Sequence, residues 1–261
     1  MFQYSAIMKT SYCFIVTILL GFVIINSCVK DEENPIVKDI DGNVYHTVRI
    51  GNQVWMAENL KTTRYNDGAE IPLVEDIDSW SVLTEPGFCF YNNDSLTNHF
   101  LNREVYGALY NWNTINSKKL CPAGWHIPSD DEWKSLEIYI GLTRTEADST
   151  GWRGTGQGKL LMALFDWAID TTGCWSDSLL LYPSDTHVRS VTNSTGFTAL
   201  PSGIRNSDGT FSDIRNRGMW WSSTKEGSNT AIVRSLKYNS NNIYRLNLDT
   251  RLGCSVRCVK D

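Results

Sequence analysis

The sequence has little excess charge of either sign and no run of basic residues. Of its 261 residues, 24 are lysine or arginine and 29 are aspartate or glutamate, which gives a formal net charge of −5. A protein that binds nucleic acid needs a basic surface to neutralise phosphates. The composition therefore argues against nucleic acid as a partner. A charged fraction of 20% and an aromatic fraction of 11% are typical of a globular chain.

Metal-ligand spacings and catalytic groupings are also missing. The sequence contains no Cys-X-X-Cys pair, and its four histidines (46, 99, 126 and 187) are scattered. A structural zinc site would require closely spaced cysteine or histidine ligands, so we expect no metal and no cofactor. No nucleophile–histidine–acid grouping stands out either. The sequence therefore predicts a protein that is not an enzyme.

The N-terminal apolar run is too short to span a bilayer comfortably. It covers residues 11–25 and follows Lys9, whereas a membrane-spanning helix needs roughly 20 apolar residues. A short apolar run behind a positive charge is typical of a secretory signal. The run ends in Ile-Asn-Ser-Cys at residues 25–28, which resembles a bacterial lipobox, whose cysteine receives a diacylglycerol and further acylation. An ordinary secretory signal with a chance cysteine is the alternative.

The residues after Cys28 favour a position at the cell surface. Lys-Asp-Glu-Glu at residues 30–33 resembles the export tag of surface lipoproteins in Bacteroidetes-type bacteria, although a generic polar linker is the alternative. Such a charged segment stays solvated and cannot pack into a core. We therefore predict a lipoprotein signal peptide at 1–27, an acidic flexible tether at 28–36 and one folded domain at 37–261. The protein would be anchored to the outer membrane through lipid on Cys28.

Strand patterns predominate at both ends of the folded part. Asp-Gly at 41–42 and Gly-Asn at 51–52 are hairpin dipeptides, so residues 36–60 are predicted to form a three-stranded meander. Within it the alternation from Val44 to Ile50 would place Val44, His46, Val48 and Ile50 on one apolar face. Further strands are predicted at 196–205, 218–224, 231–238, 243–248 and 254–261.

Helices are predicted between these two strand-rich regions. Ser129 and Glu132 have the spacing of a capping box, Trp133 and Leu136 mark a buried helical face, and Gly141 ends the helix. Residues 102–112 are predicted to form a helix with an aromatic face, and residues 151–167 a loop before a short helix. Residues 169–195 are polar and are interpreted as a surface insertion.

Several sequence blocks occur together in an order that resembles one family. The blocks are IGNQVWMAENL, YNDG with IP, YGALYNW, LCPAGWHIPSDDEW, GFTALPSG, WWSST and the terminal SVRCVKD. Over about residues 39–261 they resemble the Fibrobacter succinogenes major paralogous domain. Members of that family are typically secreted or lipid-anchored bacterial surface proteins. The domain is similar in turn to the C-type lectin-like fold and to formylglycine-generating enzymes.

The resemblance implies an α+β, C-type lectin-like fold. Such a fold has antiparallel hairpins with paired N- and C-terminal strands, one to three helices and long irregular loops. The resemblance also implies a disulfide between Cys121 and Cys258, which would close a long loop and stabilise the chain by about 4–5 kcal/mol. Cys254 stands where the family usually has an aromatic residue. The pairing of Cys89, Cys174 and Cys254 is therefore left open.

A surface binding or adhesion module is the function that these features favour. Its partner would be a glycan or a surface protein. The pattern of calcium-dependent lectins, an Asn/Glu/Asp set beside a proline, is not present in a clean form. The candidate ligand-binding residues are Trp220, Trp221, Arg217, Asn216 and Tyr238. Strand alternation predicts that at least one of the two tryptophans is buried.

Two alternatives remain at the level of sequence. The first is a structural envelope component without a ligand site. The second is an enzyme related to formylglycine formation, with copper or cysteine chemistry at Cys254 and Cys258. Fully oxidised cysteines would exclude this second alternative.

Overall fold

The computed structural model describes residues 35–94, 102–164 and 191–261. Predictions for the signal peptide, Cys28, Cys174 and most of the segments 28–36 and 169–195 fall outside these ranges and stay predictions. These described residues form one compact unit. Within the described ranges, no helix is long and apolar enough to cross a membrane.

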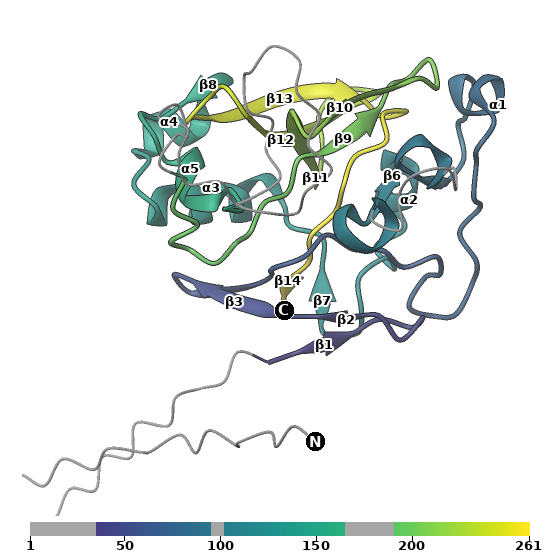
Figure 1. Ribbon diagram of the computed structural model, residues 1–261, viewed down its shortest axis with the longest axis horizontal. Helices are drawn as coiled ribbons and strands as arrows, with labels where there is room; N and C mark the ends of the chain where they lie inside the picture. The colour runs from purple at the N-terminus through teal and green to yellow at the C-terminus, as the bar shows by residue number, and fades with distance from the viewer. Residues whose placement is uncertain (1–34, 95–101, 165–190) are drawn as a thin grey trace, which may run out of the picture. The chain divides into compact units, whose positions relative to one another are not determined.

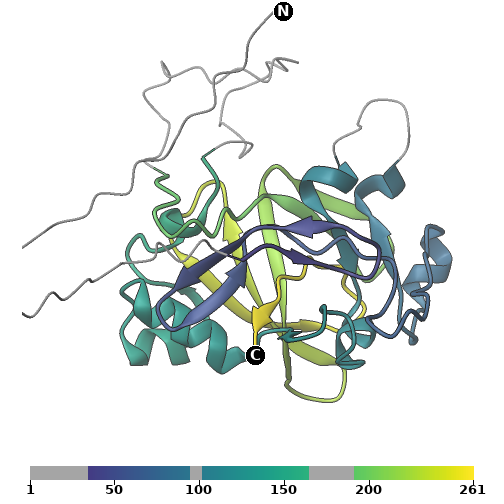
Figure 2. The ribbon, with the colours of Figure 1, turned by 90° about the horizontal axis from the view of Figure 1, so that it is seen from below.

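Four short strands begin the domain, and the last two share a sheet with the end of the chain. β1 (Val37–Lys38) and β2 (Val44–Tyr45) pair with each other in a sheet of their own, and β3 (Thr47–Ile50) and β4 (Gln53–Met56) follow them. The sheet runs β3-β4-β14-β7, where β14 is Val259–Lys260 and β7 is Trp125–His126 (Figures 1 and 2). Val259 pairs antiparallel with Trp55 on one side and with His126 on the other. The expected pairing of N- and C-terminal strands is therefore present, although β4 rather than the first strand is the partner.

The prediction that Val44 and His46 lie on a buried apolar face is wrong. Tyr45 and Thr47 are buried, whereas Val44 is exposed. The reason is a polar anchor, because the Tyr45 hydroxyl donates to Asp39 Oδ2 at 2.6 Å and accepts from the Lys61 amide at 3.0 Å. The turn at Gly51 does follow the prediction, since Ile50 and Gln53 pair across a two-residue loop.

A second four-stranded antiparallel sheet carries most of the C-terminal half. Its order is β11-β12-β13-β8, with β11 at Arg217–Lys225, β12 at Thr230–Lys237, β13 at Ile243–Asp249 and β8 at Gly151–Arg153. Helices α3 (Asp130–Tyr139), α4 (Arg144–Asp148) and α5 (Gly158–Leu161) gather near the β8 end of this sheet (Figure 1). Strands β11, β12 and β13 correspond to strands predicted from the sequence. β8 does not, because it lies in a segment predicted as a loop before a short helix.

Two hairpins and two short helices complete the described fold. The hairpins are β5 (Phe88–Phe90) with β6 (Ala108–Tyr110), and β9 (Ser202–Arg205) with β10 (Phe211–Ile214). The helices are α1 (Ile77–Ser81) and α2 (Trp112–Asn116). The short helical turns η1 (Tyr91–Asp94) and η2 (Asn102–Tyr106) follow β5 and precede β6. All strand pairs of the named elements are antiparallel, which with the interspersed helices gives an α+β fold.

The helix predicted over residues 102–112 is wrong. The segment is a π-helical turn followed by strand β6, and α2 begins only at Trp112. Gly107 is the cause, because it has φ +76° and a Cβ there would lie 2.8 Å from the Leu60 carbonyl oxygen. The close approach lets Ala108 donate to the same oxygen at 3.0 Å, so the chain continues as a strand.

The number of helices also exceeds the one to three expected. Five α-helices lie in the described residues, but only α3, with ten residues, is longer than five. The predicted details of α3 are confirmed, since Ser129 and Glu132 form the capping box and Trp133 and Leu136 are buried. Local capping chemistry therefore located the one helix that has substantial length.

The disulfide between Cys121 and Cys258 is confirmed. The two Cα atoms lie 6.0 Å apart across a sequence separation of 137 residues. Cys89 and Cys254 are free and buried. The bridge ties the segment before β7 to the segment before β14, and so fixes the edge of the sheet where the C-terminal strand enters.

Candidate functional site

The two predicted tryptophan ligands belong to the core. Trp220 and Trp221 are 1% and 0% exposed. Trp220 Nε1 donates to Asn59 Oδ1 and Trp221 Nε1 donates to the Tyr110 carbonyl oxygen, both at 2.8 Å. Neither indole therefore presents a face to solvent, and both sides of β11 are covered here.

The other three predicted ligands lie together at one end of β11 and β12. Asn216, Arg217 and Tyr238 are half-buried, and the Tyr238 amide donates to the Asn216 carbonyl oxygen at 2.8 Å. Arg217 Nε lies 3.6 Å from Asp213 Oδ2. None of the three lines the hollow that is described next.

A hollow of about 550 Å³ opens between three segments that are distant in sequence. These segments are the start of α1, the η1 turn after β5, and the β9–β10 hairpin. Its lining combines aromatic, amide, hydroxyl and carboxylate groups. The lining residues are Glu75, Ile77, Tyr91, Asn92, Asn93, Arg205, Gly209, Thr210 and Phe211.

Arg205 forms the floor of the hollow and joins two of its walls. Its side chain is fully buried, and its guanidinium donates to the carbonyl oxygens of Val74, Glu75 and Asp76 on the approach to α1. Its Nε donates to the Gly209 carbonyl oxygen at 3.1 Å in the β9–β10 turn. These bonds fix the α1 approach against the hairpin and satisfy the buried donors.

Aromatic rings enclose the same guanidinium. The Arg205 Cζ atom lies 4.4 Å from the Trp80 ring centroid and 4.8 Å from the Phe211 ring centroid. Tyr91 lies beyond Phe211, with ring centroids 5.3 Å apart and planes inclined by 59°. Tyr91 and Phe211 are only half-buried, so part of their apolar surface remains available at the hollow.

The polar part of the lining is preformed. Asn92 and Asn93 hold left-handed φ values of 53° and 51°, a conformation that asparagine tolerates better than most residues. Asn93 Nδ2 donates to the Glu75 carbonyl oxygen at 2.9 Å, and the Thr210 hydroxyl donates to Asp208 Oδ1 at 2.6 Å. The exposed Glu75 side chain adds a carboxylate.

Acidic groups surround this lining. Hydrogen bonds from Ser79 lower the pKa of Asp76, and hydrogen bonds from Thr210 lower the pKa of Asp208. Both carboxylates are therefore ionised at neutral pH. The rim of the hollow is negative, while its single cation, Arg205, is buried among carbonyl oxygens and rings.

A separate cluster of buried charges lies between α3 and the sheet β11-β12-β13-β8. Glu137 is fully buried and receives Arg153 Nη1 at 2.9 Å, Arg153 Nη2 at 2.7 Å and Arg234 Nε at 2.6 Å. Glu137 was not among the residues predicted from the sequence. Its position four residues after Trp133 places it on the buried helical face, and this spacing could have identified it as a buried acid.

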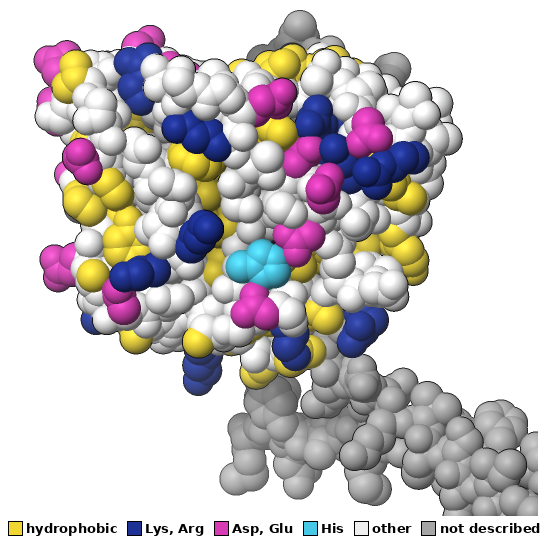
Figure 3. Space-filling model, turned by 180° about the vertical axis from the view of Figure 1, so that it is seen from behind, with side chains coloured by type: hydrophobic (Ala, Val, Ile, Leu, Met, Phe, Trp, Pro, Cys, Tyr) yellow, Lys and Arg dark blue, Asp and Glu magenta, His cyan; other side chains and the backbone are white. Residues whose placement is uncertain are grey.

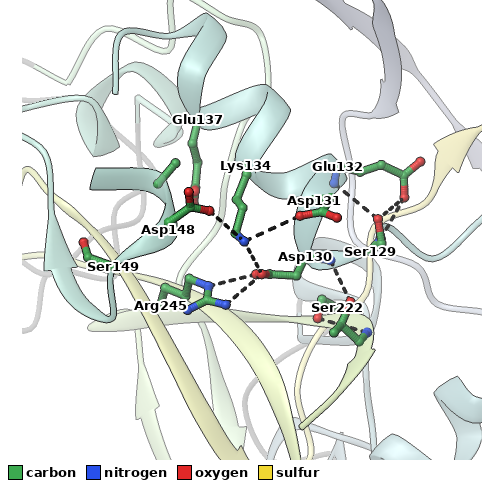
Figure 4. Close-up of polar contacts among 12 residues, drawn as sticks. Ser129, Asp130, Asp131, Glu132, Lys134, Glu137, Asp148, Ser149, Ser222 and Arg245 are labelled. Carbon is green, nitrogen blue, oxygen red and sulfur yellow. Dashed lines mark hydrogen bonds and ion pairs between the residues drawn. The ribbon is translucent and has the colours of Figure 1, made fainter. Parts of the chain in front are cut away.

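Asp130 is the second acid of this cluster, drawn in Figure 4. Arg245 contacts both carboxylate oxygens, at 2.9 and 2.7 Å, and Lys134 Nζ lies 3.0 Å from Oδ2 and 2.9 Å from Asp148 Oδ1. Burial raises the pKa of Asp130, but Arg245, Arg234 and Lys134 together lower it by more. The net result is a pKa well below the usual range of an aspartate. The charges satisfy one another, so the cluster fastens α3 and α4 to the sheet.

The four cysteines in the described ranges do not assemble a reactive pair. Cys258 is bonded to Cys121, and Cys254 is fully buried, which raises the pKa of its thiol. Chemistry that uses Cys254 and Cys258 together would require a free Cys258 thiol. Across the described ranges, no three histidine, cysteine, aspartate or glutamate side chains gather in a way that could hold a metal ion.

The face of the domain drawn in Figure 3 carries charges of both signs. Basic and acidic side chains are interspersed there, and no basic stripe runs across it. That face therefore does not have the continuous positive potential that phosphate backbones require.

Comparison with known proteins supports one family. The family model described as the Fibrobacter succinogenes major domain matches residues 48–260. No curated protein and no solved structure matches the chain. The family match confirms the resemblance drawn from the sequence blocks.

Proposed function

The chain belongs to the Fibrobacter succinogenes major domain family, and on this premise we propose that it is a surface-exposed outer-membrane lipoprotein. Lipid on Cys28 anchors it, and residues 28–36 form the tether. The domain at 37–261 acts as a binding or adhesion module with a C-type lectin-like fold and carries out no reaction. Its partner is a glycan or a protein of the surroundings.

Strand order and cross-linking support the C-type lectin-like part of the proposal. β14 enters between β4 and β7, and the Cys121–Cys258 bridge lies beside this entry. The family resemblance implied the bridge and a pairing of N- and C-terminal strands, although it did not specify β4 and β7 as the neighbours of β14. The bridge and this pairing join the two ends of the domain around the segments that lie between them in sequence.

The hollow at Arg205 is the observation that carries the binding function. Its walls are fixed by buried hydrogen bonds, and its lining offers aromatic surface beside polar groups. Ligand sites in proteins combine these two features, with apolar surface for affinity and a few placed polar groups for orientation. The charges of the buried cluster under α3, in contrast, are paired with one another and shut away from solvent.

Two experiments test the proposal. Cells grown with labelled palmitate should incorporate label into the mature chain, Cys28→Ala should abolish the label, and protease added to intact cells should remove the domain. A chain without label would contradict the anchor. The purified protein should bind members of a broad glycan, mucin and surface-protein panel, and binding to none of them would favour a structural component instead.

A further inference from the structure

We propose that the hollow lined by Tyr91, Phe211 and Glu75 binds a single uncharged pyranose unit of a glycan. This inference rests on the proposed binding function and names the ligand class and its site. The hollow, at about 550 Å³, falls within the range of roughly 300–1,000 Å³ for small-molecule sites. It has room for one sugar ring and its hydroxyl groups, and it is open to solvent for the rest of a chain.

The aromatic pair provides the apolar contact. A pyranose ring presents a patch of C–H groups, and such a patch packs against an aromatic ring. Tyr91 and Phe211 are adjacent, tilted and half-buried. Phe211 is held on one side by the Arg205 guanidinium, so its position does not depend on a ligand.

The polar lining matches sugar hydroxyl groups. A hydroxyl both donates and accepts, so it suits a site that contains acceptors and donors together. Glu75 supplies a carboxylate that accepts, Asn92 and Asn93 supply side-chain amides, and Thr210 supplies a hydroxyl oxygen. A site for an anion would be lined by free cations, which this lining lacks.

Charge excludes acidic sugars from the hollow. Arg205 is the one cation in the lining, and four of its N–H groups donate to the carbonyl oxygens of Val74, Glu75, Asp76 and Gly209. Four of its five N–H groups are therefore already used within the protein and are not available to a ligand carboxylate. The Glu75 side chain lies in the lining, and Asp76 and Asp208 are next to lining residues, so a uronate or sialate carboxylate would meet like charge.

The walls require little rearrangement on binding. Gly209 has φ +86°, and a Cβ there would lie 2.4 Å from the Ile77 carbonyl oxygen. The hairpin turn and α1 are thus in direct backbone contact, and Arg205 holds them together. A preformed site loses less conformational entropy when the ligand binds.

Calorimetry with defined sugars tests the inference. The full-length chain is purified in a polyoxyethylene detergent, because glucoside and maltoside detergents carry a pyranose themselves. Glucose, galactose, mannose and N-acetylglucosamine are compared with glucuronate and N-acetylneuraminate. At least one neutral sugar should bind, and neither acidic sugar should compete with it.

Two variants locate the site. Tyr91→Leu keeps an apolar side chain but removes the ring, and should weaken binding roughly five- to tenfold. Glu75→Gln changes an exposed side chain and should weaken binding roughly threefold, because a charged acceptor forms the stronger hydrogen bond. Glu85→Gln, also exposed and outside the hollow, is the matched control and should bind as the parent does.

The outcomes separate this inference from the function on which it rests. A neutral sugar that binds equally well to the parent, Tyr91→Leu and Glu75→Gln overturns the hollow as the site but leaves a binding module. Stronger binding of the acidic sugars overturns the charge argument. A chain that binds panel proteins but no sugar contradicts the inference alone, and a chain that binds nothing contradicts both proposals.

Discussion

Arg153 and Glu137 face each other in a two-point ion pair that is shut off from solvent. Arg153 Nη1 lies 2.9 Å from Oε2 and Nη2 lies 2.7 Å from Oε1, and the two side chains are 1% and 0% exposed. The pair connects β8 with α3, and Arg234 of β12 shares the same carboxylate. One buried acid therefore holds a helix against two strands of the sheet.

Removing that acid's charge should destabilise the domain strongly. Glu137→Gln leaves the buried Arg153 guanidinium without a carboxylate and Arg234 with Asp130 alone, and breaking a buried pair typically costs about 3–5 kcal/mol. The free energy of unfolding, measured with urea, should fall by that amount. Glu85→Gln changes an exposed glutamate and should alter it by less than about 0.5 kcal/mol. Equal effects of the two substitutions would contradict the structural role of the ion pair.

The disulfide should contribute a comparable amount of stability. Replacing both Cys121 and Cys258 with alanine opens a loop of 137 residues, for which the chain-entropy relation gives a loss of about 5 kcal/mol. Thermal unfolding of the double variant should begin at a much lower temperature than that of the parent. A reducing agent added to the parent should reproduce the shift, and an unchanged midpoint in both cases would contradict the bridge.

The two free thiols in the described ranges should not react while the domain is folded. Burial raises the pKa of Cys89 to about 12 and also raises that of Cys254, and the thiolate is the reactive form. A maleimide reagent at pH 7 should therefore leave both unlabelled in native protein and label both in urea. Peptide mass spectrometry distinguishes these sites from Cys174. Rapid native labelling of either residue would show that the site opens.

His126 should make part of the stability depend on pH. Burial lowers its pKa, but hydrogen bonds to Asp261 and Glu132, at 2.6 and 2.7 Å, raise it more, so the net shift is upward. Because the pKa of His126 is higher in the folded than in the unfolded protein, its ion pairs contribute fully to stability below the unfolded pKa, near 6.5. This stabilisation is lost as the pH rises through the folded pKa.

Unfolding measured across pH 5 to 9 tests this dependence. Because the imidazole is 41% exposed, the contribution should stay below about 1 kcal/mol. The parent should exceed His126→Gln in stability at pH 5 by more than at pH 9. A difference that grows with pH would contradict the assigned direction.

Gly209→Ala should disturb the wall of the hollow. The added Cβ would approach the Ile77 carbonyl oxygen and would adopt φ +86°, a value that disfavours side chains. We expect a loss of about 2 kcal/mol in unfolding free energy, together with weaker sugar binding. Gly42→Ala is the matched control, because Gly42 has φ +85° but open space around it. This substitution should lower the unfolding free energy only by the cost of placing alanine at a positive φ. Equal losses would contradict the close approach.

Local chemistry explains which parts of the fold could be predicted. The capping box at Ser129 and Glu132 acts over three residues, so the sequence located α3 correctly. The break at Gly107 depends on the Leu60 carbonyl oxygen, which lies far away in sequence. No local pattern contains that neighbour, and a helix was therefore predicted where a strand forms.

The candidate site was beyond the reach of local patterns for the same reason. The hollow combines residues 75–77, 91–93 and 205–211, and none of these segments has a distinctive sequence by itself. The prediction that at least one of Trp220 and Trp221 is buried is confirmed, but their choice as ligand residues required an open face, and this part of the strand is covered on both sides. The aromatic rings that do line the hollow, Tyr91 and Phe211, are brought together only by the tertiary fold.

The place of β14 between β4 and β7 governs when the domain can fold. On the side of β4 that faces β14, Trp55 has no partner until Val259 has been synthesised. The disulfide of Cys121 likewise cannot form until Cys258 has been synthesised. The β3–β4 pair can form early, but the other side of β4 must remain unpaired while most of the polypeptide is made. The sheet and the cross-link are thus completed only when the last residues are in place, so a chain shortened by a few residues at its end would lack both.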